Sequence, residues 1–115
     1  MHEMPATRGM LELALASMER AGAERILAID VVVGDLTSIV DDSVQFYFDI
    51  LSRGTPAAGA ELRFRRESAE GRCLECGHTF DVTPPLVRTC PACDALALRV
   101  TGGREFYVDS IEVDE

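Results

Sequence analysis

Four cysteines arranged in two pairs are the residues of this 115-residue chain with the clearest chemistry. Cys73 and Cys76 form one Cys-x2-Cys pair, Cys90 and Cys93 form the other, and thirteen residues separate the two pairs. Two residues between cysteines allow a tight turn to aim both sulfurs at one point, and two such turns can supply four thiolates to a tetrahedral ion. The spacing therefore predicts a four-cysteine zinc site.

The predicted zinc site is structural. Four thiolates saturate zinc and leave no open position for a catalytic water. Iron is chemically permitted in the same cage, but zinc is the commoner occupant. A lobe of this size holds little apolar core, so zinc should supply on the order of 10 kcal/mol of its folding free energy. We expect His78 to be a surface residue and not a further ligand, with pH sensing as the alternative role.

The first three residues, Met1, His2 and Glu3, form a second candidate chelator. Because His2 is too large for removal of the initiator methionine, we expect Met1 to keep a free α-amine. That amine, the amide nitrogen of His2 and its imidazole can close two adjacent rings on one ion, and Glu3 can fill a fourth position. Such planar donation suits Ni(II) or Cu(II) and not Zn(II). The alternative interpretation is an incidental histidine on a frayed terminus.

The charge balance argues against nucleic acid as a partner. Acidic residues outnumber basic residues 20 to 11, for a net charge of -9, whereas a nucleic-acid binder depends on a basic face. Arg63, Arg65 and Arg66 form the only dense positive run. No segment approaches the ~20 apolar residues that span a bilayer, and the N-terminus lacks the features of a signal peptide. We therefore expect a cytoplasmic protein, in which cysteines serve as metal ligands more often than as disulfides.

The elements that must position these groups follow from apolar periodicity. Residues 10–18 read as an amphipathic helix that ends at Gly22, and a second helix is expected between Ser43, as its cap, and Gly54. The β-branched run 26–33 predicts a buried strand. Residues 62–66 alternate as a half-exposed strand, and residues 106–113 predict a last strand whose apolar phase slips near Ser110.

These elements predict an α+β fold with two helices packed on a small sheet of about three strands. Residues 1-68 would form a nickel-binding core that is completed by a C-terminal strand in 101-115. Residues 69-100 would form an inserted zinc-ribbon-like lobe that carries the four cysteines. Either outer strand could pair with a second copy, so both a monomer and a homodimer stay open.

Taken together, these motifs resemble the HypA/HybF family of hydrogenase and urease nickel metallochaperones. The resemblance covers essentially the whole chain and rests on the Met-His-Glu start and both cysteine pairs, together with Gly34-Asp35-Leu36, Phe46-Tyr47-Phe48 and Ile111-Glu112-Val113. It implies nickel at His2 with the Met1 amine and Glu3, and zinc at Cys73, Cys76, Cys90 and Cys93.

The same resemblance implies partners. Nickel would pass to the large-subunit precursor of nickel-iron hydrogenase with the help of a HypB-type GTPase, and urease accessory proteins are a further candidate. One departure is Pro5, where the family usually has a Ser that caps the first helix.

Two other function classes remain as alternatives. A zinc-ribbon module for protein or nucleic-acid interaction would need no nickel, and as a nucleic-acid binder it would show a basic lobe face. An enzyme is not expected, because the chain has no Gly-rich phosphate loop, no nucleophile elbow and only two histidines.

Overall fold

Two helices and six strands make up the computed structural model, which describes residues 3–114. Contacts group the chain into two units. The first holds the described residues up to Val32, Ile39–Arg65 and the segment from Phe106 onward, and the second holds Val33–Ser38 and Arg66–Glu105. The predicted mixed α+β fold is confirmed. The boundaries after residues 68 and 100 stay a prediction, since they concern independent folding.

Helix α1, Glu3–Arg20, begins the first unit. Its buried residues recur at three- and four-residue spacing, as expected for a helix with one apolar face: Thr7, Met10, Leu11, Ala14 and Met18. Pro5 stands in the first turn, where its missing N–H costs nothing. Gly22, two residues after the end of the helix, has a φ of +72°. There the N–H of Ala23 donates to the carbonyl of Met18 at 3.2 Å, which completes a Schellman motif.

Helix α2, Asp41–Leu51, begins earlier than the sequence predicted. The expected cap at Ser43 is wrong, because Ser43 already lies in the first turn and its N–H donates to the carbonyl of Val40 at 3.0 Å. Val40 is the N-cap residue and has no side-chain cap bond. Its own N–H donates instead to the Glu3 carboxylate at 3.3 Å. The acidic Asp41 and Asp42 thus enter the first turn, where the helix dipole favours negative charge.

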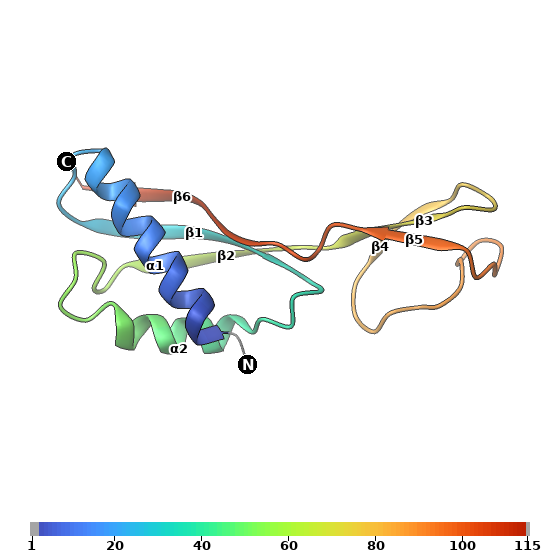
Figure 1. The fold of residues 1–115 in the computed structure, drawn as a ribbon, viewed down its shortest axis with the longest axis horizontal. Coiled ribbons are helices and arrows are strands. Elements are labelled where there is room, and N and C mark those ends of the chain that lie inside the picture. Colours follow the sequence, from blue (N-terminus) through green and yellow to red (C-terminus); the bar gives the residue numbers. More distant parts are fainter. Residues whose placement is uncertain (1–2, 115) are drawn as a thin grey trace. The chain divides into compact units, whose positions relative to one another are not determined.

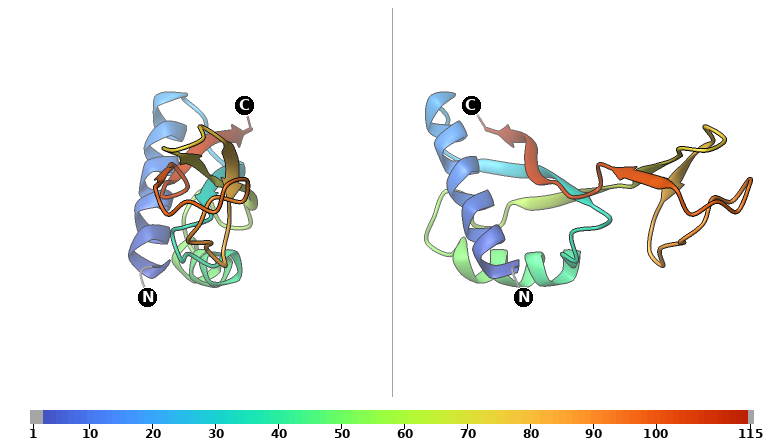
Figure 2. Two further views of the ribbon diagram at one scale, coloured as in Figure 1. Left: turned by 90° about the vertical axis from the view of Figure 1, so that its right-hand side faces the viewer. Right: turned by 45° about the vertical axis from the view of Figure 1, so that its right-hand side comes forward.

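The first sheet has the strand order β2-β1-β6. Strand β1, Ile26–Gly34, is central and almost wholly buried, and β2, Glu61–Glu67, and β6, Phe106–Val113, are the edges. Helix α1 runs across these strands and packs against α2 and β6 (Figures 1 and 2). The predicted phase slip in β6 is confirmed, since Asp109 and Ser110 are exposed in succession.

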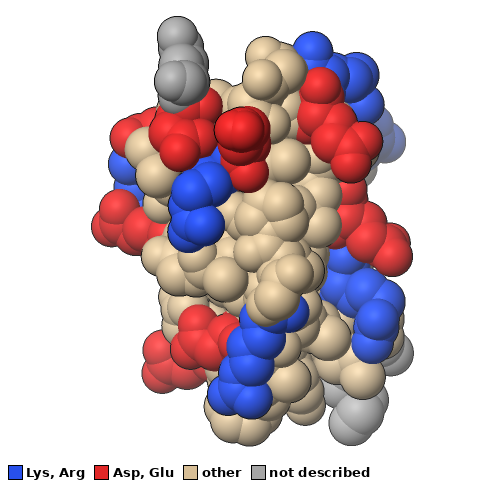
Figure 3. All heavy atoms as spheres, turned by 90° about the vertical axis from the view of Figure 1, so that its left-hand side faces the viewer, with Lys and Arg blue, Asp and Glu red and all other residues tan. Residues whose placement is uncertain are grey.

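The arginines of β2 are engaged in ion pairs. The Arg63 guanidinium lies 2.9 Å from Asp30 and 3.3 Å from Glu112, and Arg65 lies 3.7 Å from Asp109. Arg63 and the Ser110 hydroxyl hold the pKa of Asp30 below its usual value. Positive and negative side chains also interleave on the face drawn in Figure 3. The one dense basic run of the sequence is therefore largely neutralised, which further opposes a nucleic-acid surface.

The second sheet lies in the second unit and has the order β4-β3-β5. Its short antiparallel strands are β3, Ala69–Cys73, β4, Thr79–Val82, and β5, Leu98–Thr101. A Cβ at Gly71 would lie only 2.6 Å from the Phe80 ring, so glycine at this position allows the ring to pack closely against β3. The sequence predicted the lobe but not these three strands. Among residues 3–114, neither helix has the length and apolar character that a membrane crossing demands.

The core packing of α2 leads to a testable prediction. Phe48 is 1% exposed, whereas Phe46, two residues away on the same helix, is 61% exposed. Phe48→Ala should lower the free energy of unfolding by about 3–5 kcal/mol because it leaves a cavity. Phe46→Ala is the matched control and should change it by no more than about 0.5 kcal/mol. Chemical denaturation of both variants measures the difference, and equal effects would contradict the assigned burial.

Candidate metal centre

The four cysteine sulfurs converge on one point in the second unit. Their Sγ atoms all lie within 4.8 Å of one another. The Cys73 and Cys93 sulfurs are 3.6 Å apart, and so are the Cys76 and Cys90 sulfurs. Ligands about 2.3 Å from a tetrahedral zinc ion would stand about 3.8 Å from each other. The donor set and its spacing therefore fit a single zinc ion.

Each cysteine pair is shaped by a tight turn with one left-handed residue. In the first turn Gly77 has a φ of +79°, and its N–H donates to the carbonyl of Cys73 at 2.9 Å. In the second turn Asp94 has a φ of +66°, and its N–H donates to the carbonyl of Cys90 at 2.8 Å. The two turns thus share one geometry, although only the first has the glycine that this backbone favours.

Backbone N–H groups point at the sulfurs from within the turns. Glu75 and Cys76 both donate to the Cys73 sulfur at 3.4 Å, and Ala92 donates to the Cys90 sulfur at 3.3 Å. Such bonds stabilise a thiolate more than a neutral thiol. Cys73 and Cys90 are buried, while Cys76 and Cys93 are exposed. Backbone N–H groups therefore favour the thiolate form of the buried Cys73 sulfur.

The pKa values of the Cys73 and Cys93 thiols are shifted in opposite directions by their neighbours. The N–H groups of Cys76 and Glu75 lower the pKa of Cys73 to about 7. At Cys93 the N–H of Ala95 lowers the pKa, but the nearby Cys73 thiol and burial outweigh it and raise the pKa to about 12. Like charges this close disfavour one another's ionisation. Four thiolates can coexist here only around a cation, which reverses the balance.

Hydrogen bonds attach both turns to neighbouring backbone. The N–H of Leu74 donates to the carbonyl of Ala97 at 2.8 Å, which continues the pairing of β3 with β5, and the N–H of Cys73 donates to the carbonyl of His78 at 2.9 Å. The His78 side chain is exposed and stacks on the Phe80 ring, with centroids 5.7 Å apart. It is not part of the cysteine cluster that the described residues form.

The candidate nickel ligands are placed only in part. Met1 and His2 lie outside the described residues. Glu3 is the first residue of α1, and its carbonyl accepts a hydrogen bond from the Thr7 hydroxyl at 2.5 Å. Its carboxylate also accepts the N–H of Val40 at the start of α2. The sequence did not predict this last contact, since no local pattern connects residues 37 positions apart.

Comparison with a family profile identifies the family of this chain. The profile described as "Hydrogenase/urease nickel incorporation, metallochaperone, hypA" matches residues 1–113. The chain belongs to the HypA family. The resemblance inferred from the sequence motifs is therefore confirmed, and with it membership of a family of nickel metallochaperones for hydrogenase maturation.

Individual HypA proteins agree with this assignment. The hydrogenase maturation factor HypA of Dehalococcoides mccartyi is 44% identical over 115 residues, covering 100% of this chain and 96% of the relative. The HypA protein of Caldanaerobacter subterraneus subsp. tengcongensis is 37% identical, covering 99% of this chain and 100% of the relative. The similarity is thus spread over both units and is not limited to the cysteine turns.

Two solved structures share the fold. The solution structure of the Ni metallochaperone HypA from Helicobacter pylori superposes with a TM-score of 0.66 at 20% identity, covering 98% of this chain and 97% of that one. A second HypA solution structure gives a TM-score of 0.69 at 22% identity, covering 98% and 96%. The HypA fold therefore accommodates wide sequence divergence.

A cysteine substitution tests the metal centre. Cys90→Ser should abolish zinc binding and unfold the lobe, because structural zinc contributes on the order of 10 kcal/mol. Thr89→Ser, one residue earlier, is the matched control and should retain zinc. Metal analysis and thermal unfolding of purified protein measure both properties. A Cys90→Ser variant with one zinc per chain and unchanged melting would show that this sulfur is not a ligand.

The left-handed residues of the two turns give a second prediction. Asp94→Gly should stabilise the lobe by about 0.5 kcal/mol, since relief of left-handed strain slightly exceeds the entropy cost of glycine. At the equivalent position, Gly77→Ala should destabilise the lobe by about 1 kcal/mol. Denaturant unfolding of the zinc-loaded variants measures both changes. Destabilisation by Asp94→Gly would mean that the Asp94 side chain makes a stabilising contact.

Proposed function

We propose that this chain is a nickel carrier that binds one Ni(II) ion through the Met1 amine, His2 and Glu3. The observation that carries the proposal is the match of the nickel-incorporation profile from residue 1 onward, so that it includes all three ligands. An amine, an amide nitrogen and an imidazole in succession favour a planar ion, and Ni(II) accepts that geometry more readily than Zn(II) does.

The position of Glu3 supports this ligand set. Its main chain begins α1, and its carboxylate lies at the start of α2 through the bond to Val40. The third ligand is therefore held by two helices, while the proposed amine and imidazole donors precede α1.

The zinc site has a separate role in the proposal. Cys73, Cys76, Cys90 and Cys93 would hold Zn(II) permanently and stabilise the second unit, with no position left for nickel chemistry. Zinc supplies charge compensation for the four sulfurs and contributes no reaction step. The two metals are then distinguished by their donors, since thiolates in a tetrahedron suit zinc and nitrogens in a plane suit nickel.

The recipient of the nickel is also part of the proposal. We assign delivery to the large-subunit precursor of nickel-iron hydrogenase, in cooperation with a HypB-type GTPase. The relatives named hydrogenase maturation factor support the first recipient. The description of the family profile mentions urease as well, which supports urease maturation as a second destination.

The two histidines of the chain allow a matched test of nickel binding. His2→Ala should lose nickel and retain zinc, whereas His78→Ala should retain both metals. Nickel affinity should also fall as the pH drops through about 8 and further below about 6.5, because the amine and then the imidazole take up the protons that they must lose to bind. Calorimetry on protein with a native, untagged N-terminus measures these effects. Undiminished nickel binding by His2→Ala would refute the ligand set.

A further inference from the structure

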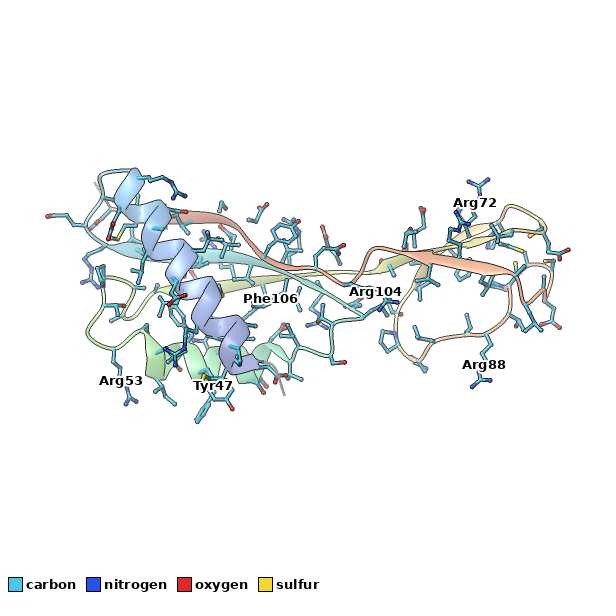
Figure 4. The ribbon with its side chains drawn as sticks, in the orientation of Figure 1. Tyr47, Arg53, Arg72, Arg88, Arg104 and Phe106 are labelled. Atoms are coloured by element: carbon cyan, nitrogen blue, oxygen red, sulfur yellow. The ribbon has the colours of Figure 1, made fainter. Side chains whose placement is uncertain are left out.

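Two arginines of the second sheet face each other across neighbouring strands. Arg72 on β3 is in register with Arg99 on β5 in the antiparallel pairing. Directly opposite residues of an antiparallel pair project from the same face of a sheet, and like charges at such positions are destabilising. Both side chains are exposed, and Arg72 points away from the sheet (Figure 4). Repulsion between Arg72 and Arg99 should therefore destabilise this sheet.

These two guanidinium groups lack the partners that other arginines have. Arg63 and Arg66 each lie within 3.1 Å of an aspartate. Among residues 3–114, by contrast, no carboxylate comes within ion-pairing distance of Arg72 or Arg99. Glu70 lies on the same face as the pair, opposite Thr101, without an ion pair to either arginine. The two positive charges are therefore available to a ligand.

A hollow of about 550 Å³ opens beside the pair. Arg72, Arg99 and Thr101 supply hydrogen-bond donors to it, and the first cysteine turn forms its other wall. Glu70 and Glu75 also line the hollow. The hollow is large enough for a side chain or a short peptide segment, and the adjacent metal centre fixes one wall of it.

We propose that Arg72 and Arg99 form a binding site for a carboxylate in an acidic segment of a partner protein. A carboxylate has two oxygens with about four acceptor positions, so it can accept hydrogen bonds from two guanidinium groups at once. An anion between the two arginines also removes their mutual repulsion. Glu70 and Glu75 line the same hollow and oppose the ligand's charge, which keeps the complex reversible. The site does not depend on nickel binding or on the identity of the nickel recipient.

The test uses the zinc-loaded full chain and nuclear magnetic resonance. A capped peptide, Gly-Glu-Gly-Glu-Gly, is titrated while the Nε–H signals of the arginines are followed, and its glutamine counterpart is the ligand control. The glutamate peptide should shift the signals of Arg72 and Arg99, with a response that weakens as salt is added. The glutamine peptide should leave both signals unchanged.

Matched variants identify the groups responsible. Arg99→Gln should weaken the glutamate peptide about tenfold or more, as expected for loss of a charge-assisted hydrogen bond. Arg88→Gln is the control, because Arg88 is exposed in the same unit, lies outside the hollow and projects from a different loop (Figure 4). It should change the affinity less than twofold. Glu70→Gln should instead tighten binding about two- to threefold, since it removes a repelling charge.

Three results would overturn the proposal. Equal weakening by Arg88→Gln and Arg99→Gln would mean that only net charge matters. Equal shifts with sodium acetate at the same carboxylate concentration would mean that the site takes free carboxylates and does not recognise a peptide segment. Loss of zinc from Arg99→Gln would mean that the arginines offset the charge of the thiolates, and the carboxylate site would then be rejected.

Discussion

Repulsion between four sulfurs is the constraint on which the second unit depends. The chain holds these atoms within 4.8 Å of one another, and, against the opposing effect of the Ala95 N–H, the Cys73 thiol and burial raise the pKa of Cys93 to about 12. A divalent cation bound at the centre of the four sulfurs would convert this repulsion into cohesion. The apolar interior of the unit is small, with Val33, Ala69 and Val82 as its buried aliphatic residues, while Leu86 and Leu96 are exposed. The four-cysteine cluster is therefore the candidate centre around which this unit is organised.

The first unit is stabilised in the ordinary way, by an apolar core. Strand β1 is buried between two partner strands, and Val44 and Phe48 bury one side of α2. This core fixes the start of α1 beside the start of α2, where Glu3 connects them. The two units thus have different sources of stability, and each carries one of the two candidate metal sites.

Features of the fold and of the metal centre could be predicted from the sequence where they depend on residues close together in the chain. The helices, β1 and the convergence of the cysteines follow from periodicity and spacing over a few residues, and so does the tight turn at Gly77. The start of α2 does not, because a glutamate 37 residues earlier replaces the side-chain cap that Ser43 was expected to supply. The strands of the second sheet are four or five residues long and mix charged residues with Gly71, so their sequences lack a clear β pattern. The pairing of Arg72 with Arg99 depends on the register of those strands. It could not be predicted, because the strands themselves had no clear sequence pattern.

The topology of the first sheet has a consequence for biosynthesis. Strand β1 pairs with β6, and the N–H of Asp114 donates to the carbonyl of Arg25 across 89 positions of sequence. On a ribosome, every residue of the cysteine lobe is made before β6. The edge of β1 that pairs with β6 therefore stays unpaired until the whole cysteine lobe has been made, and β6 joins the sheet last.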